Sequence, residues 1–325
     1  MSGAPFRTGR VPDVASHTVL RSLRRYGISS ADGDADVEAA WRLLVAGAYA
    51  QDLNVQDQTG IPHLPGSSSS SEFGKDRATP GPVVCSTFKA WKHLLAASGR
   101  VVPLSSEPYR YDLVNLGREV LAQISTPASL NFSDATADKK MDPALLTSTG
   151  HFYAQLLEDV DTLVATDTAF LLGPWIASAR RWGNSSPNAS SAPADCGNSA
   201  VGIPAENCPH FYEWNARVQL TTWNPTLKGS ADIPRGPIDY ASKHWSGLIK
   251  DYYAARAKLL LTQALSDAAQ GKPLDEAAVK RTNAAHAYDF TMSTHDYPLD
   301  PVGDAVQISQ MMLAKYSPLF DTCRK

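Results

Sequence analysis

Apolar residues recur along this chain at three- and four-residue intervals from residue 14 almost to the C-terminus, and Val/Ile-rich alternating runs are missing. This interval places apolar side chains on one face of an α-helix. We therefore expect an all-α domain over residues 1–325, an irregular bundle of about ten helices. The predicted helices cover residues 14–26, 36–50, 86–98, 110–125, 143–166, 168–182, 209–223, 238–269, 275–294 and 302–316.

Residues that favour helix ends support this assignment. Asp142-Pro143 predicts a helix start, because proline fits the first turn. Gly27 and Gly271 suit helix ends, where a residue without Cβ can adopt a left-handed backbone. Pro174 either kinks its helix or marks the true start of that helix.

Two polar segments interrupt the helical pattern, residues 51–84 and residues 183–207. Both are rich in Ser, Pro and Gly, which predicts flexible surface loops inside the domain. Acceptor sequences for N-glycosylation begin at Asn131, Asn184 and Asn188, two of them in or beside the second loop.

The cysteines and the N-terminus point to different compartments. Cys196 and Cys208 lie twelve positions apart, a spacing that a local disulfide could close, whereas we expect Cys85 and Cys323 to be ordinary thiols. The first residues, MSGAPFRTGRVPDV, lack the apolar core of a signal peptide, which by itself indicates the cytosol. The sequons and the Cys196/Cys208 pair instead favour a secretory parent whose N-terminal part is missing.

Charge and hydropathy exclude two classes of partner. The 325 residues contain 30 Lys+Arg and 33 Asp+Glu, a formal net charge of −3, so no broad basic field attracts nucleic acid or an anionic membrane. No apolar run reaches the roughly 18 residues needed to cross a bilayer. We expect neither nucleic acid nor a membrane as partner.

The segment from Phe211 to Leu261 combines aromatic side chains with hydrogen-bonding groups, as carbohydrate sites do. Pro225 keeps Asn224 out of the helical region and so leaves Trp223 at a rim. Pro237 is expected to open a long helix whose free N–H groups face the same loop, next to Tyr240. The aromatic residues of the segment include Trp214, Trp223, Tyr240, Trp245, Tyr252 and Tyr253.

Other residues of the segment suit structural roles. The stripe at three- and four-residue intervals predicts core packing. Asp239 and Lys243 could pair on one helix face. Asn215, Arg217 and Arg256 suit polar anchors behind a site. The members of the stripe are Trp245, Leu248, Ile249, Tyr252, Tyr253 and Leu259.

The sequence offers no catalytic constellation of its own. Glycoside hydrolysis needs two facing carboxyls, but Glu158, Asp159 and Asp161 are expected to form a solvated helix face and Glu213 is alone in the aromatic segment. Histidines at metal-ligand spacing, phosphate loops and dinucleotide fingerprints are missing. We expect no metal and no cofactor.

Several motifs, in order and at matching spacing, resemble the helical C-terminal domain of the α-N-acetylglucosaminidases, glycoside hydrolase family 89. They are RRYG, AAWRLL, FKAWKHLL, YRYDLVNLGREVL, FLLGPWIASAR, FYEWNARVQLTTWNP and IDYASKHWSGLIKDYYAAR. In that family the two catalytic glutamates lie on a (β/α)8 barrel that precedes the helical domain. The helix-only pattern here cannot form such a barrel.

The resemblance implies that Trp223, Asn224, Ile238 and Tyr240 line the site for a terminal α-linked N-acetylglucosamine, as found in heparan sulfate, together with the barrel. It also implies a lysosomal or secreted parent enzyme and a chain that is inactive alone. The alternative is a non-catalytic carbohydrate-binding or interaction module.

Overall fold

The fold is a bundle of α-helices. The computed structural model describes residues 13–28, 33–50, 61, 77–101, 107–184, 196, 201–204 and 207–324, and within them it contains ten α-helices and no β-strand. The one extended pairing there is an isolated parallel bridge between Leu171 and Ser246. The all-α prediction is confirmed.

The helices follow the predicted order. They are α1 (Val14–Arg25), α2 (Ala35–Ala46), α3 (Pro82–Ala96), α4 (Glu107–Ala137), α5 (Pro143–Val164), α6 (Leu172–Asn184), α7 (Cys208–Leu220), α8 (Ala255–Ala269), α9 (Glu276–Met292) and α10 (Ala305–Tyr316). Short 3₁₀ segments cover Ala48–Ala50, Ser98–Arg100, Thr168–Phe170 and Ser317–Arg324, and a π-helix, η4 (Ile249–Ala254), precedes α8.

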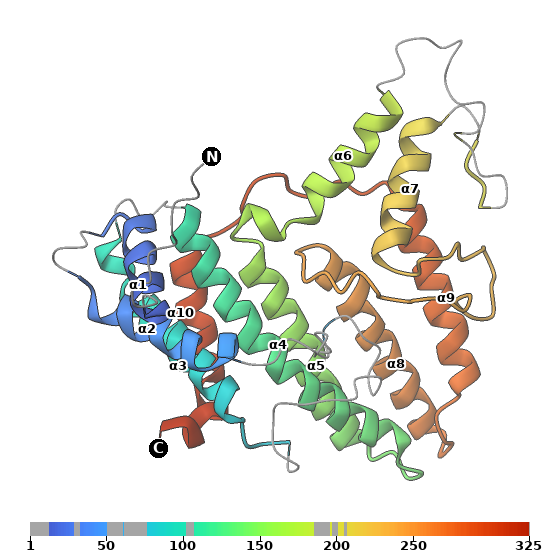
Figure 1. The fold of residues 1–325 in the computed structure, drawn as a ribbon. Coiled ribbons are helices and arrows are strands. Elements are labelled where there is room, and N and C mark those ends of the chain that lie inside the picture. Colours follow the sequence, from blue (N-terminus) through green and yellow to red (C-terminus); the bar gives the residue numbers. More distant parts are fainter. Residues whose placement is uncertain are drawn as a thin grey trace, which may run out of the picture.

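The helices pack as neighbours around one main core. Helices α4, α5 and α8 form the middle of the bundle, α1, α2 and α3 cluster at one end, and α9 packs on α8 at the opposite side (Figure 1). The pair α6/α7 projects from the other end, and α10 returns to pack on α3, α4 and α5. Large buried side chains such as Trp91, Tyr153 and Tyr252 fill the core, each with less than 2% of its surface exposed.

Local signals determine several helix ends as expected. The Asp142 carboxylate accepts a hydrogen bond from the backbone N–H of Ala144 and begins α5 (3.0 Å). Gly27 and Gly271 follow α1 and α8 with φ of 71° and 66°. Because α6 begins at Leu172, Pro174 lies in its first turn, the second of the two alternatives.

Two helix predictions were wrong in extent. Helix α4 does not end near residue 125 but continues through Pro127 to Ala137, because its buried face packs along α5 on both sides of the proline. Residues 238–247 are not helical: Asp239, Ser242 and Gly247 have φ of 58°, 44° and 91°, and the helical segment starts only at residue 248.

Two disulfides cross-link the chain. Cys196 and Cys208 are joined, with 4.7 Å between their Cα atoms, as predicted. The prediction of free thiols at Cys85 and Cys323 was wrong, since these residues form a second disulfide. Their sequence separation of 238 hides the pairing, which arises because the C-terminal 3₁₀ segment packs against α3.

The two predicted loops are only partly described. The first ends earlier than expected, because α3 already starts at Pro82. In the second, Val201 and Ile203 are buried against Trp214 and Val218 of α7, a small apolar cluster within a segment predicted to be a polar surface loop. The structure describes residue 61 and residues 77–84 of the first segment, and residues 183–184, 196, 201–204 and 207 of the second.

The glycosylation acceptors occupy different places. Asn131 is exposed on α4, where its amide oxygen accepts a hydrogen bond from Arg77 (3.4 Å), and Asn184 is the last residue of α6. Asn188 lies outside the described residues.

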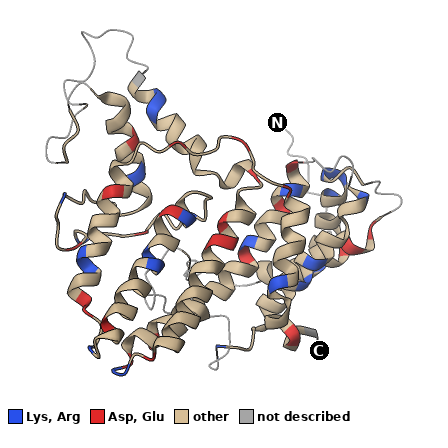
Figure 2. Cartoon of the chain, turned by 180° about the vertical axis from the view of Figure 1, so that it is seen from behind, with Lys and Arg blue, Asp and Glu red and all other residues tan. Residues whose placement is uncertain are grey.

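Acidic and basic residues are scattered over the helices in Figure 2 and do not gather on one element. No helix among the described residues is both long and apolar enough to span a bilayer.

Candidate functional site

Trp223 lies at the surface just beyond the end of α7. The helix ends at Leu220, and the backbone N–H of Trp223 donates to the carbonyl of Val218 (2.8 Å). Trp223 has φ of 61°, which turns the chain away from the helix axis, and 47% of its surface is exposed.

Tyr240 comes from the next turn and meets Trp223 edge to face. The ring centroids are 5.9 Å apart with an interplanar angle of 68°. Tyr240 is 67% exposed, so the two rings form an open aromatic corner. The structure therefore brings together the two aromatic residues singled out from the sequence, although sixteen intervening residues separate them.

Asn224 and Ile238 lie next to the two rings and stabilise the loop between them. The amide group of Asn224 donates to the carbonyl of Arg235 (2.8 Å) and closes the loop between the two rings. A Cβ at Gly236 would overlap the same amide nitrogen, so a larger residue there would displace the Asn224 side chain. Ile238 is partly buried against the main core.

The expected helix N-terminus at Pro237 is absent. Residues 238–241 form turns, so no row of free helical N–H groups faces the loop there. The backbone N–H of Asp239 donates to the carbonyl of Thr221 (2.7 Å), which ties the Tyr240 turn to the end of α7. The two turns are therefore joined by this backbone hydrogen bond, and the expected helix N-terminus does not contribute to the site.

A buried ion pair holds the Tyr240 turn. Arg256 Nη1 donates to Asp239 Oδ2 (2.9 Å), and the two side chains are 1% and 3% exposed. Asp239 therefore does not pair with Lys243 as predicted, because its left-handed backbone directs the carboxylate inward. Burial raises the pKa of the Asp239 carboxyl from its ordinary 3.8 to about 6, although Arg256 acts to lower it.

Arg256 itself lies against two aromatic rings. Its guanidinium carbon is 4.4 Å from the ring centroid of Tyr252 and 5.2 Å from that of Tyr253. Such cation–π contacts favour the charged guanidinium within the core. Tyr252 and Tyr253 are buried as predicted for the core stripe, and Arg256 is buried beside them.

A second buried carboxylate fixes the start of the π-helix. Asp161 accepts hydrogen bonds from the backbone N–H groups of Gly247 (2.7 Å) and Lys250 (3.0 Å), and from the hydroxyl of Ser246 (3.1 Å). The prediction that Asp161 belongs to a solvated helix face was wrong, because α5 packs against this turn. Asp159 is also buried, where it accepts from the hydroxyl of Tyr316 (2.7 Å).

Glu213 and Arg217 are structural. Both are buried, and Arg217 donates twice to the Glu213 carboxylate (2.7 and 3.0 Å). Arg180 of α6 donates to the same carboxylate at 2.6 and 2.9 Å. This carboxylate is occupied by two guanidinium groups and is not accessible to a substrate.

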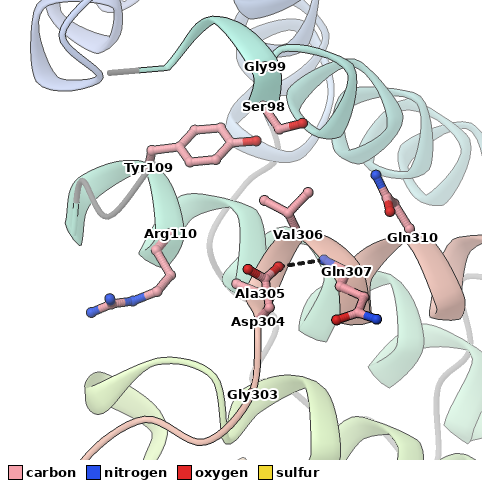
Figure 3. A pocket seen from close by; sticks show the side chains of 10 residues that line it. All are labelled: Ser98, Gly99, Tyr109, Arg110, Gly303, Asp304, Ala305, Val306, Gln307 and Gln310. Atoms are coloured by element: carbon pink, nitrogen blue, oxygen red, sulfur yellow. Dashed lines mark hydrogen bonds between the residues drawn. The ribbon is translucent and has the colours of Figure 1, made fainter. Parts of the chain in front are cut away.

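A cavity of about 580 Å³ lies away from the Trp223–Tyr240 corner, between α4, α10 and the Ser98–Arg100 turn (Figure 3). Three of the polar side chains that line it already have partners. Asp304 accepts from the backbone N–H of Gln307 (2.7 Å) as the N-cap of α10, and Arg110 pairs with Asp167 (3.0 Å). The Tyr109 hydroxyl donates to a backbone carbonyl, and its ring is buried. This cavity lacks an exposed ring for a sugar face.

Comparisons with known proteins agree on one family. The family model "Alpha-N-acetylglucosaminidase (NAGLU) C-terminal domain" matches residues 22–315. The human protein named alpha-N-acetylglucosaminidase is 29% identical over 323 residues, which is 98% of this chain but 38% of the human protein. The chain thus spans well under half the length of that relative.

Solved structures of a family 89 glycoside hydrolase from Clostridium perfringens share the fold. One carries two glutamate-to-glutamine substitutions and holds its substrate, GlcNAc-α-1,4-galactose; it has a TM-score of 0.69 and 18% identity, over 92% of this chain and 31% of that chain. Another, in complex with 2-acetamido-1,2-dideoxynojirmycin, has a TM-score of 0.69 and 18% identity over 93% of this chain and 31% of that one.

Proposed function

Because this chain belongs to the family of α-N-acetylglucosaminidase C-terminal domains, we propose that residues 1–325 act as one domain that forms one wall of a site for a terminal α-linked N-acetylglucosamine. The observation that carries the proposal is the exposed Trp223–Tyr240 corner, held in place by the buried Asp239–Arg256 pair. The opposite wall belongs to a catalytic barrel domain.

The chemistry of the corner suits this ligand. An aromatic face covers the C–H face of a pyranose or the methyl group of an acetamide, and the hydroxyl of Tyr240 supplies a hydrogen bond at its edge. Ile238 adds apolar contact beside Tyr240. Asn224 acts indirectly, because its amide group braces the loop.

Bond cleavage is assigned to the barrel. A retaining double displacement needs two carboxyl groups at roughly 5 Å, one as nucleophile and one as acid and base. A family 89 relative that holds its substrate carries two glutamate-to-glutamine substitutions, which supports two glutamates for that chemistry. Asp239, the carboxyl next to the corner, is paired with Arg256 and faces inward.

The family membership also suggests a biological setting. We extend the proposal to heparan sulfate degradation by a secreted or lysosomal glycoprotein. Two disulfides support an oxidising compartment. Glycans at Asn131 and Asn184 are compatible with an exposed side chain and a helix end.

Binding tests the wall directly. Saturation-transfer NMR of the purified chain with N-acetylglucosamine should show transfer to the acetyl methyl group, with a Kd in the millimolar range, since half of the site is missing. Trp223→Ala and Tyr240→Ala should each weaken the signal. Tyr49→Ala, at a residue that is also exposed (63%), is the matched control and should keep it.

Activity tests the division of labour. The chain alone should not hydrolyse a chromogenic α-N-acetylglucosaminide. A chimera in which it replaces the corresponding domain of the Clostridium perfringens enzyme should hydrolyse this substrate. In that chimera, Tyr240→Phe should lower kcat/KM by a factor that corresponds to a loss of about 1–3 kcal/mol of transition-state binding. A chimera in which Trp223→Ala and Tyr240→Phe both kept full kcat/KM would refute the assigned corner.

A further inference from the structure

A second aromatic surface lies on the projecting helix pair, apart from the Trp223–Tyr240 corner. Helices α6 and α7 form a groove of about 180 Å³. Trp175 and Trp182 from α6 and Tyr212 from α7 supply its rings; the other lining residues are Ser178, Ala179, Asn215, Ala216 and Gln219. The sequence patterns did not predict this surface.

Helical spacing explains how these residues meet. On α6, Trp175, Ser178 and Trp182 stand at positions i, i+3 and i+7, and on α7, Tyr212, Asn215 and Gln219 repeat the same spacing. Residues at this spacing share one helix face. The two faces therefore lie along the same groove, with rings and polar groups alternating.

The groove is preformed. Arg180 of α6 pairs with Glu213 of α7, and a Cβ at Gly183 would overlap the backbone nitrogen of Pro209, so the helices approach closely there. The indole N–H of Trp175 donates to the carbonyl of Ala216 (3.2 Å), which fixes that ring. Binding of a ligand therefore costs little conformational entropy to order these walls.

The groove combines apolar rings with uncharged polar groups, which suits an amphipathic, uncharged ligand. Trp182 is 71% exposed, and Trp175 is 38% exposed. In the described part of the chain, the amides of Asn215 and Gln219 and the hydroxyl of Tyr212 make no hydrogen bond, so they are available to a ligand. No charged side chain among the described residues lines the groove.

We infer that the α6/α7 groove binds one neutral pyranose ring of a glycan. Indole faces take the C–H face of a pyranose, and free amides take its hydroxyl groups. The small volume fits a single ring, since pockets for larger ligands start at about 300 Å³. An anionic ligand such as a sulfated sugar would find no cation among the described residues that line the groove.

The groove stands close to the Trp223–Tyr240 corner along the chain. Gln219, at its end, lies in the last turn of α7 and precedes Trp223 by four residues. The ring bound in the groove could belong to the same glycan as the terminal sugar or to a separate one. The inference rests on the groove alone and does not require the function proposed for the corner.

The test uses the 325-residue chain and four separate probes. Cellotriose, maltotriose, chitotriose and a sulfated heparin trisaccharide are titrated by tryptophan fluorescence and saturation-transfer NMR. At least one neutral trisaccharide should bind with a millimolar Kd. Trp182→Ala should weaken that binding about tenfold, as expected for an exposed aromatic anchor. The combined Asn215→Ala and Gln219→Ala change should weaken it several-fold while the melting temperature stays unchanged.

Two control variants distinguish binding in the groove from binding at the corner or at any exposed ring. Tyr49→Ala should leave trisaccharide binding intact, and so should Trp223→Ala, which disables only the corner. A partial loss with Trp223→Ala, in addition to the tenfold loss with Trp182→Ala, would still support binding in the groove and would mean that one glycan spans both sites. The inference is overturned if Trp182→Ala leaves every neutral affinity unchanged, if only the sulfated probe binds, or if Trp182→Ala changes self-association alone.

Discussion

The buried Asp239–Arg256 pair predicts an unusual dependence of stability on pH, which Asp239→Asn should abolish. Burial holds the pKa of Asp239 at about 6 in the folded chain, against an ordinary value of 3.8. Between these values the folded state binds the proton and the unfolded state does not. Stability therefore rises as pH falls through this window.

The size of the effect follows from the two pKa values. One pKa unit corresponds to about 1.4 kcal/mol, so the change from 3.8 to about 6 amounts to about 3 kcal/mol in total. From about pH 7.5 to about pH 5, only part of this is gained, about 1.5 kcal/mol. Asparagine resembles the protonated acid and does not titrate, so the variant lacks this gain.

Urea unfolding at both pH values measures this gain in stability. The free energy of unfolding of the native chain, minus that of Asp239→Asn, should increase by about 1.5 kcal/mol at the lower pH. Other titrating groups cancel in this difference. Asp296→Asn is the control: Arg180 lowers the pKa of this exposed carboxyl, so its difference should stay flat across the window. A constant difference for Asp239→Asn, or one that shrinks on acidification, would refute the reasoning and mean that attraction to Arg256 outweighs burial.

Three further changes test the packing. Cys323→Ser opens the long-range disulfide and should lower the free energy of unfolding by about 2–5 kcal/mol, seen as a lower urea midpoint than that of the oxidised native chain. Gly173→Ala should cost about 1–3 kcal/mol, because its Cβ would overlap the backbone carbonyl oxygen of Pro298, whereas Gly99→Ala, with nothing within 4 Å, should be neutral in the same thermal melts. Asp161→Ala removes the acceptor for the Gly247 amide and should cost about 1–3 kcal/mol, and hydrogen exchange at that amide should accelerate.

The sequence carried most of the helical architecture because its signals are local. An amphipathic period and caps such as Asp142 act within a few residues, and they predicted the order of the helices correctly. The sequence also singled out Trp223 and Tyr240, and both rings are exposed, although α7 ends at Leu220, before the stop predicted from Pro225.

The errors all came from contacts distant in sequence. Asp239 adopts a left-handed backbone because Arg256, seventeen residues later, takes its carboxylate, and no local rule predicts that for a residue after proline and isoleucine. Cys85 and Cys323 meet only after the bundle closes. The α6/α7 groove did leave a local signal, since Trp175 and Trp182 are seven residues apart on a predicted helix, but the facing residues of α7 emerge only from the fold.

The Cys85–Cys323 disulfide makes most of the described bundle a covalently closed ring. A protease that cut a single peptide bond inside this ring would leave both fragments attached, and the cut would be visible only after reduction. Helices α1 and α2 precede Cys85 and lie outside the ring, held by packing and by polar contacts such as the hydrogen bond from Tyr26 to Asp112. They can detach from α3 without breaking a covalent bond. Limited digestion should therefore remove this end of the bundle first and leave the Trp223–Tyr240 corner on the part that remains.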